Sequence, residues 1–271
     1  MPRPEHLDWL ADTSERQNTA CGREIEIWQL NPRENVGVLS AWAAHFRRHY
    51  ISDEELPVMV DGTEFTKAEY LRQILFPDSA QAPGPSLRSG DFGEILVADY
   101  IEYVLGYWCP RELRYQERWN RNDSTKGCDV IGFKFVAEGQ TNLNDELFLF
   151  ETKSGMSVST NNRLQDAITD SDKDKLREAM SLNAIKQKLI RRGALGDANR
   201  VRRFQNMADR PFRRINGAAA ILDDVVFGET DLTTSDASAH HNQANIRLIV
   251  IKGPSMMTLI HSLYERAANE A

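Results

Sequence analysis

The sequence contains few cysteines. Cys21, Cys109 and Cys128 are odd in number and widely spaced, and they form neither a CxxC pair nor the pattern of a disulfide-rich secreted domain. The first residues, MPRPEHLDWLADTSERQ, carry prolines and charges where a signal peptide has a continuous apolar core. We therefore expect a cytoplasmic protein that does not depend on disulfide bonds.

Long hydrophobic runs, repeats and low-complexity tracts are also absent. No run of about 18 apolar residues could cross a bilayer, so the sequence is not that of an integral membrane protein. No GxxxxGK[ST] motif occurs, so we expect this chain to bind no nucleotide and any ATP-driven step to belong to a partner. The composition, 41% hydrophobic and 27% charged over 271 residues, is that of a globular protein with one large domain or two small ones.

A stretch rich in Pro, Gly and Ser at 77–90, PDSAQAPGPSLRSG, is typical of a linker and predicts a domain boundary. Before it, residues 36–51 and 66–76 show helical spacing of apolar residues, and Thr66 and Glu69 fit a capping box. Residues 1–88 are therefore expected to form a small, mainly helical module. It has no converging acids, so we expect it to serve docking or control, and we expect its removal to leave a site in residues 89–271 intact.

Residues 89–271 mix helical and strand patterns. The segment 91–108 is expected to be a helix with Glu94 on its apolar stripe, which comprises Val97, Ala98, Ile101, Val104, Leu105 and Trp108. Strand patterns follow at 112–119, 128–136 and 146–153, then basic helical stretches at about 172–192 and 197–208, strands near 217–227 and 245–253, and a closing helix at 254–268. This order predicts an α/β fold, a mixed sheet flanked by helices.

The strand ELFLFETKSG, residues 146–155, changes from apolar to charged at its end. Alternate residues of a strand share a face, so Leu147, Leu149, Glu151 and Lys153 point the same way. An isolated acid and base at this spacing are usually a structural ion pair. Asp129, which opens the preceding strand, changes this interpretation, because a hairpin would place it beside Glu151. Two converging carboxylates repel each other unless a cation lies between them.

Glu94 adds a third acid on the core-facing side of the preceding helix, although an acid there could simply favour the helix dipole. Together the order helix Glu94, strand Asp129, strand Glu151-x-Lys153 and basic helix resembles the PD-(D/E)xK phosphodiesterase superfamily. The resemblance implies an αβββαβ restriction-endonuclease-like core, with Asp129 and Glu151 as ligands of Mg²⁺ (or Mn²⁺), Lys153 as the group that orients or activates water, and Glu94 as the helix acid. Cys128 stands where the superfamily name has proline, a position that varies widely.

The chain is also similar to a narrower family, HamA, the small subunit of Hachiman anti-phage systems. The segments SGDFGEILVADYI, GCDVIGF and LFLFETKSG carry this resemblance, together with the helical N-terminal part and the overall length. It implies a Mg²⁺-dependent nuclease that cleaves DNA in phage defence, in complex with a helicase partner.

A basic stretch follows the Glu151-x-Lys153 strand. Residues 173–214 contain 13 Lys or Arg and 4 Asp or Glu, a balance of +9, whereas the whole chain carries -7. This could be a solvated helix surface, but its position favours contact with a phosphate backbone. The predicted nucleic-acid-binding residues are Lys173, Lys186, Lys188, Arg191, Arg192, Arg200, Arg202 and Arg203.

Two other patterns are set aside, and two other functions stay open. DSDKDK, residues 170–175, imitates a calcium loop but has Lys175 and Ser181 where Gly and Glu belong. His240 and His241 lack ligand-like spacing, so we expect a mobile loop there. The chain could instead be a catalytically silent nucleic-acid-binding or regulatory subunit, or an RNA endonuclease toxin, because two carboxylates do not distinguish ribose from deoxyribose.

Overall fold

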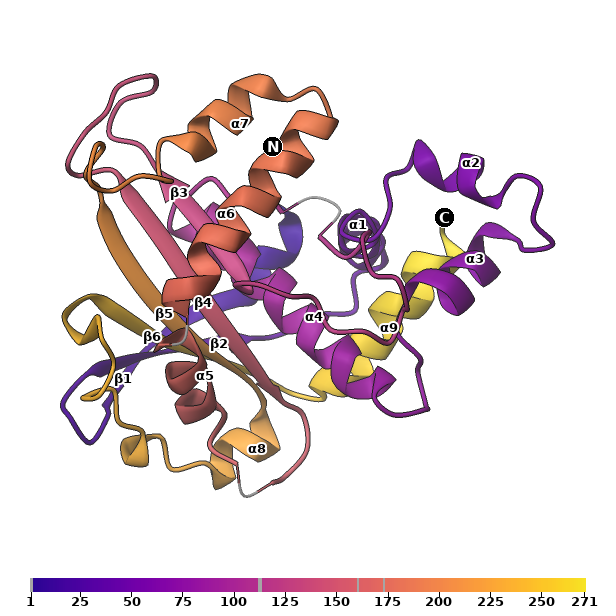
Figure 1. Ribbon diagram of the computed structural model, residues 1–271. Helices are drawn as coiled ribbons and strands as arrows, with labels where there is room; N and C mark the ends of the chain where they lie inside the picture. Colours follow the sequence, from indigo (N-terminus) through magenta and orange to yellow (C-terminus); the bar gives the residue numbers. More distant parts are fainter. Residues whose placement is uncertain (1, 112–113, 160, 173) are drawn as a thin grey trace.

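The protein is described by a computed structural model that covers residues 2–111, 114–159, 161–172 and 174–271 (Figure 1). Within these ranges one six-stranded mixed sheet has the order β1-β2-β6-β5-β4-β3. The strands are β1 (Leu10–Asn18), β2 (Glu24–Leu30), β3 (Val130–Lys134), β4 (Glu146–Gly155), β5 (Arg213–Asp223) and β6 (Ile246–Gly253). The three pairings β2/β6, β6/β5 and β5/β4 are parallel, and the two outer pairings, β1/β2 and β4/β3, are antiparallel.

Helices cover both faces of this sheet, which confirms the expected α/β class (Figure 1). On one face Phe148 and Phe150 of β4 join a core built with α1, α4 and α9. On the other face α5 packs on β4 and β5, while α6 and α7 cover Leu147 and Leu149. The helices are α1 (Val36–Arg47), α2 (Glu55–Val60), α3 (Lys67–Tyr70), α4 (Gly84–Asp99), α5 (Arg163–Asp172), α6 (Asp174–Arg191), α7 (Leu195–Arg202), α8 (Asp224–Glu229) and α9 (Met256–Asn269).

Several local predictions are confirmed. Helix α1 lies in the predicted segment 36–51, α6 and α7 lie in the basic stretch, and α9 closes the chain. The capping box is present: Thr66 Oγ1 accepts from the Glu69 N–H at 3.2 Å, and Glu69 Oε2 accepts from the Thr66 N–H at 2.8 Å. The carboxylate and hydroxyl thus satisfy donors that the first helical turn leaves unpaired.

The N-terminal part is not only helical, which differs from expectation. Strands β1 and β2 lie at the edge of the main sheet, where β2 pairs in parallel with β6. Ile25 and Ile27 of β2 are buried and alternate with more exposed residues, which is the strand pattern of EIEIWQL. The domain boundary near residue 88 stays a prediction, but the sheet is continuous across it.

Two segments around α4 also differ from expectation. The second half of the predicted linker is helical, because α4 begins at Gly84 with Pro85 in its first turn, a position that proline tolerates. In the predicted strand 112–119, residues 112 and 113 lie outside the described residues, and residues 114–117 form a turn. The side chain of Arg118 pairs with Asp91 of α4 at 2.5 Å. Among the described residues, two named strands, β3 and β4, therefore lie between α4 and α5, where three were expected.

Within the described ranges, no helix combines the length and the apolar character needed to span a bilayer.

Candidate active site

The four polar residues singled out in the sequence line one cavity of about 780 Å³. Glu94 comes from α4, Asp129 directly precedes β3, and Glu151 and Lys153 lie in the second half of β4. Arg177 of α6 lines the same cavity. Residues separated by up to 59 positions in the chain therefore meet at one end of the β3/β4 pair.

The register of β3 and β4 explains how Asp129 reaches Glu151. Val130 pairs with Phe150 in this antiparallel ladder, so the preceding residue, Asp129, lies next to the residue that follows, Glu151. The Thr152 N–H donates to Asp129 Oδ2 at 2.9 Å and fixes that carboxylate. Glu151 itself is only 2% exposed. The carboxylates are thus held by strand pairing and not by a flexible loop.

Glu94 reaches the site because α4 lies very close to β4. A Cβ placed on Gly93 would stand 2.6 Å from Ser154 Oγ and 3.2 Å from Thr152 Cγ2, so the helix approaches the strand where glycine leaves room. Glu94 Oε2 accepts from Arg114 Nε at 2.6 Å and from the Tyr115 hydroxyl at 3.0 Å. The close approach and these two donors orient the helix acid toward the strand acids.

Arg114 is a site residue that the sequence did not point to. Its Nη2 atom lies 3.9 Å from Asp129 Oδ1, and its Nε atom donates a hydrogen bond to Glu94. One guanidinium therefore bridges two of the three acids. The sequence pattern predicts a strand here and gives no reason to place Arg114 beside Glu94. In the structure residues 114–117 form a turn, and Arg114 lines an adjoining cavity together with Glu94 and Asp129.

The acids perturb one another. The pKa of Asp129 is raised well above its ordinary value, chiefly by burial and then by the charges of Glu94 and Glu151, while Arg114 and the Thr152 N–H oppose the shift. Mutual repulsion of this kind is relieved by a cation placed among the carboxylates. Mg²⁺ prefers oxygen ligands, such as those of protein carboxylates. The donor set of Asp129 and Glu151 therefore fits a hard divalent cation.

Lys153 has a partner that the sequence did not indicate. Its Nζ atom lies 2.6 Å from Asp170 Oδ2, on the face of β4 that α5 covers. Partial burial acts to lower the pKa of Lys153, but the hydrogen bond to Asp170 and the charges of Asp129 and Glu151 outweigh it, so the pKa is raised. The raised pKa keeps the Lys153 ammonium protonated at neutral pH, where Asp170 holds it.

The predicted nucleic-acid-binding residues do not form one uniform surface. Lys173 lies outside the described residues. Lys186 donates to Gln205 at 2.8 Å, Arg191 lies 3.3 Å from Glu117, and Arg202 is exposed. Arg200 lies 2.7 Å from Glu138 and its guanidinium stacks 4.1 Å above the Trp108 ring.

Arg203 is a correction to this set, because it lies inside the protein. Its guanidinium donates to Asp145 Oδ2 at 2.9 Å and to the carbonyls of Arg210, Asn142 and Pro211 at 2.7 to 2.8 Å. Through these hydrogen bonds the buried Arg203 holds the segments 142–145 and 210–211 together. We therefore leave it out of the nucleic-acid-binding surface. Lys188 and Arg192 remain in the set, and Lys188 lines a cavity that also contains Asp129.

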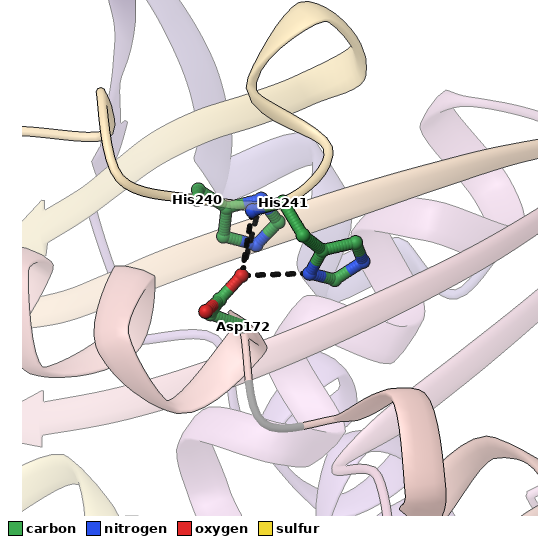
Figure 2. Close-up of side chains that lie close together, drawn as sticks. All are labelled: Asp172, His240 and His241. Atoms are coloured by element: carbon green, nitrogen blue, oxygen red, sulfur yellow. Dashed lines mark hydrogen bonds and ion pairs between the residues drawn. The ribbon is translucent and has the colours of Figure 1, made fainter.

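His240 and His241, expected in a mobile loop, contact the end of α5. His241 Nδ1 lies 2.6 Å from Asp172 Oδ1, and His240 Nδ1 lies 4.0 Å from the same oxygen (Figure 2). The ligand atoms of the three residues lie within 4.8 Å of one another. However, His240 Nδ1 accepts from the Asn242 N–H at 3.0 Å, and its Nε2 bonds Ser171 Oγ at 3.1 Å. Because both ring nitrogens of His240 form hydrogen bonds, we interpret the cluster as a structural contact that joins the end of α5 to the 240–242 segment.

The fold and the cavity together define an α/β protein with an acidic site, rimmed by a lysine, at the end of a mixed sheet. The HamA family profile matches residues 4–267, almost the whole chain. The chain belongs to the HamA family. Searches of curated proteins and of solved structures gave no match.

Proposed function

We propose that the chain is a metal-dependent nuclease that hydrolyses phosphodiester bonds of DNA. The observation that carries this proposal is the convergence of Glu94, Asp129, Glu151 and Lys153 on one cavity from three separate parts of the chain. The order of a helix acid, a strand acid and a strand Glu-x-Lys supports a PD-(D/E)xK type of site. The described core has two named strands between α4 and α5, so the support comes from the site and not from a complete αβββαβ order.

Each residue has a distinct proposed role. Asp129 and Glu151 would hold Mg²⁺, or Mn²⁺ in its place, and the cation supplies a Lewis acid for the phosphoryl oxygen and for water. Lys153, held by Asp170, stabilises negative charge as the water oxygen forms its bond to phosphorus and the ester oxygen leaves. Glu94, held by Arg114 and Tyr115, adds negative charge that favours a cation at Asp129.

Membership of the HamA family supports a role in Hachiman anti-phage defence. The family resemblance further suggests that the chain acts as an effector with a helicase subunit, which would supply the ATP-driven step. The chain carries a net charge of -7, but its α6–α7 region is basic. This distribution supports binding of a polyanion at the basic region and not over the whole surface.

Purified protein incubated with DNA and RNA, with and without Mg²⁺ and with and without a candidate helicase subunit, tests the proposal. We expect Mg²⁺-dependent cleavage of DNA, abolished by a chelator. Cleavage of RNA alone would favour the endonuclease toxin. Binding of DNA without cleavage under every condition would favour the catalytically silent subunit.

A further inference from the structure

Trp119 differs from the other four tryptophans of the chain because it is 99% exposed. Trp9 and Trp42 are buried, and Trp28 and Trp108 are partly buried. A fully exposed indole loses the burial that normally stabilises this side chain. Its position therefore calls for a ligand or partner that covers it.

Trp119 stands on a fixed segment and not on a loose tip. The preceding residue, Arg118, forms an ion pair with Asp91 at 2.5 Å, and its guanidinium stacks 4.4 Å above the Tyr115 ring. On the other side Arg121 pairs with Asp78 at 2.7 Å. Contacts on both sides of Trp119 thus tie the chain to the body of the protein, so the backbone that carries the indole is held beside the cavity.

The indole lines a cavity of about 700 Å³ that adjoins the acidic site. This second cavity also contains Glu94 and Asp129, which line the first cavity as well. Lys126, which is exposed, lies in both, and Lys188 lies in the second. A single extended ligand could therefore touch Trp119, two lysines and the acids at the same time.

We propose that Trp119 is a stacking platform for an unpaired nucleobase, and that the substrate at this site is single-stranded or locally unpaired nucleic acid. In a duplex both faces of an internal base are covered by its neighbours, so an indole can stack only on a base that is unpaired or terminal. Lys126 and Lys188 would contact phosphates on either side while the strand passes toward Asp129. This inference rests on the proposed nuclease function and adds the class of substrate.

The test uses the full chain carrying Glu151→Ala, so that nucleic acid binds without being cut. An oligothymidylate of about 12 nucleotides, within the usual site size of such surfaces, is titrated while tryptophan fluorescence is followed. We expect the oligothymidylate to quench tryptophan fluorescence. This quenching should disappear with the additional change Trp119→Phe, because the phenyl ring can still stack but does not contribute to the tryptophan signal. Trp119→Ala should weaken binding of the oligothymidylate by about 5- to 150-fold and Trp119→Phe much less. Neither should change binding of a relaxed, covalently closed duplex circle, which has no unpaired or terminal base.

Equal affinity of the Trp119→Ala and parent proteins for the oligothymidylate would overturn the inference, as would quenching that persists in Trp119→Phe. A Trp119→Ala protein that binds the oligonucleotide normally but no longer joins the helicase subunit would show that the indole is a protein contact, which also overturns it. A separate cleavage assay distinguishes failure of the nuclease proposal from failure of the stacking proposal. If the nuclease proposal fails, the chain with Glu151 restored cleaves no nucleic acid in the presence of metal, with either Trp or Ala at position 119.

Discussion

Asp170 holds the ammonium of Lys153 at 2.6 Å, and neither its place nor its role is visible in the local sequence. The change Asp170→Asn keeps the shape of the side chain and removes its charge. The ammonium would then lose its charged hydrogen-bond partner, so Lys153 should lose its fixed position. We expect the single-turnover cleavage rate to fall roughly 10- to 100-fold with little change in Mg²⁺ affinity, as is usual for a residue that orients another.

The control for this variant is Asp166→Asn on the same helix α5. Among the described residues its ion-pair partner is the neighbouring Arg163, at 3.3 Å. It should cleave like the parent. If Asp170→Asn also cleaves like the parent, Lys153 does not need its partner and the account of its orientation is wrong.

At the scale of elements, helix α6 carries basic residues near the cavity. Reversing Lys188, Arg191 and Arg192 to Glu should weaken DNA binding and reduce the slope of log affinity against log salt by about 3, because each lost phosphate contact removes about 0.9 from that slope. Fluorescence anisotropy at several salt concentrations measures this. A matched reversal of three exposed acids, Glu5, Asp8 and Glu64 to Lys, should leave binding no weaker. An unchanged slope in the first variant would make α6 an ordinary solvated surface.

Some elements could be predicted from the sequence and others could not. β4 was predictable because its long apolar run and its change to Glu151 and Lys153 are local features. β1, LADTSERQN, was not, because it is a polar edge strand with mostly exposed residues and therefore lacks the apolar alternation that marks a strand.

Some residues of the candidate site could likewise be predicted from the local sequence, and others could not. Asp129 could be placed beside Glu151 because a hairpin register is a short-range property. Arg114 and Asp170 could not be placed, because their positions depend on how a turn packs on α4 and how α5 packs on β4. Burial also separates Arg203 from Arg202, although the two are adjacent and alike in sequence.

At the scale of the whole molecule, the first 88 residues form part of the core. Tyr50 donates to Asp91 at 2.5 Å and lies 2.6 Å from the Tyr264 hydroxyl, and Trp42 and Phe46 belong to the same cluster as α9. Deleting residues 1–88 would uncover β6 and this cluster. In place of the earlier expectation of an intact site, we expect the truncated chain to show no cooperative thermal unfolding. A sharp unfolding transition with preserved Mg²⁺ binding would instead support an independent domain.

The whole molecule should also lose stability in mild acid, because His6 and His49 are buried. Burial lowers the pKa of His6 and lowers that of His49 well below its ordinary value of 6.5. Below pH 6.5 the unfolded chain therefore binds protons that the folded chain does not, and the free energy of unfolding falls by about 1.4 kcal/mol per pH unit for each histidine until its folded pKa is reached.

Thermal unfolding at pH 7.5 and 5.5 tests this expectation. The melting temperature should be lower at pH 5.5, and the difference should shrink in His49→Gln, which cannot titrate. A melting temperature that rises on acidification, or the same difference in both proteins, would contradict it.

The central claim is that Glu151 and Lys153 belong to a metal and water site, and calorimetric Mg²⁺ titration paired with a cleavage assay on Glu151→Ala and Lys153→Ala tests it most directly. Glu151→Ala removes a ligand, so Mg²⁺ affinity and cleavage should fall together. Lys153→Ala removes a positive charge from beside the cation, so Mg²⁺ binding should persist or tighten while cleavage slows roughly 100-fold or more. If Glu151→Ala cleaves like the parent, or if both variants simply unfold, the pair is structural and the nuclease account fails.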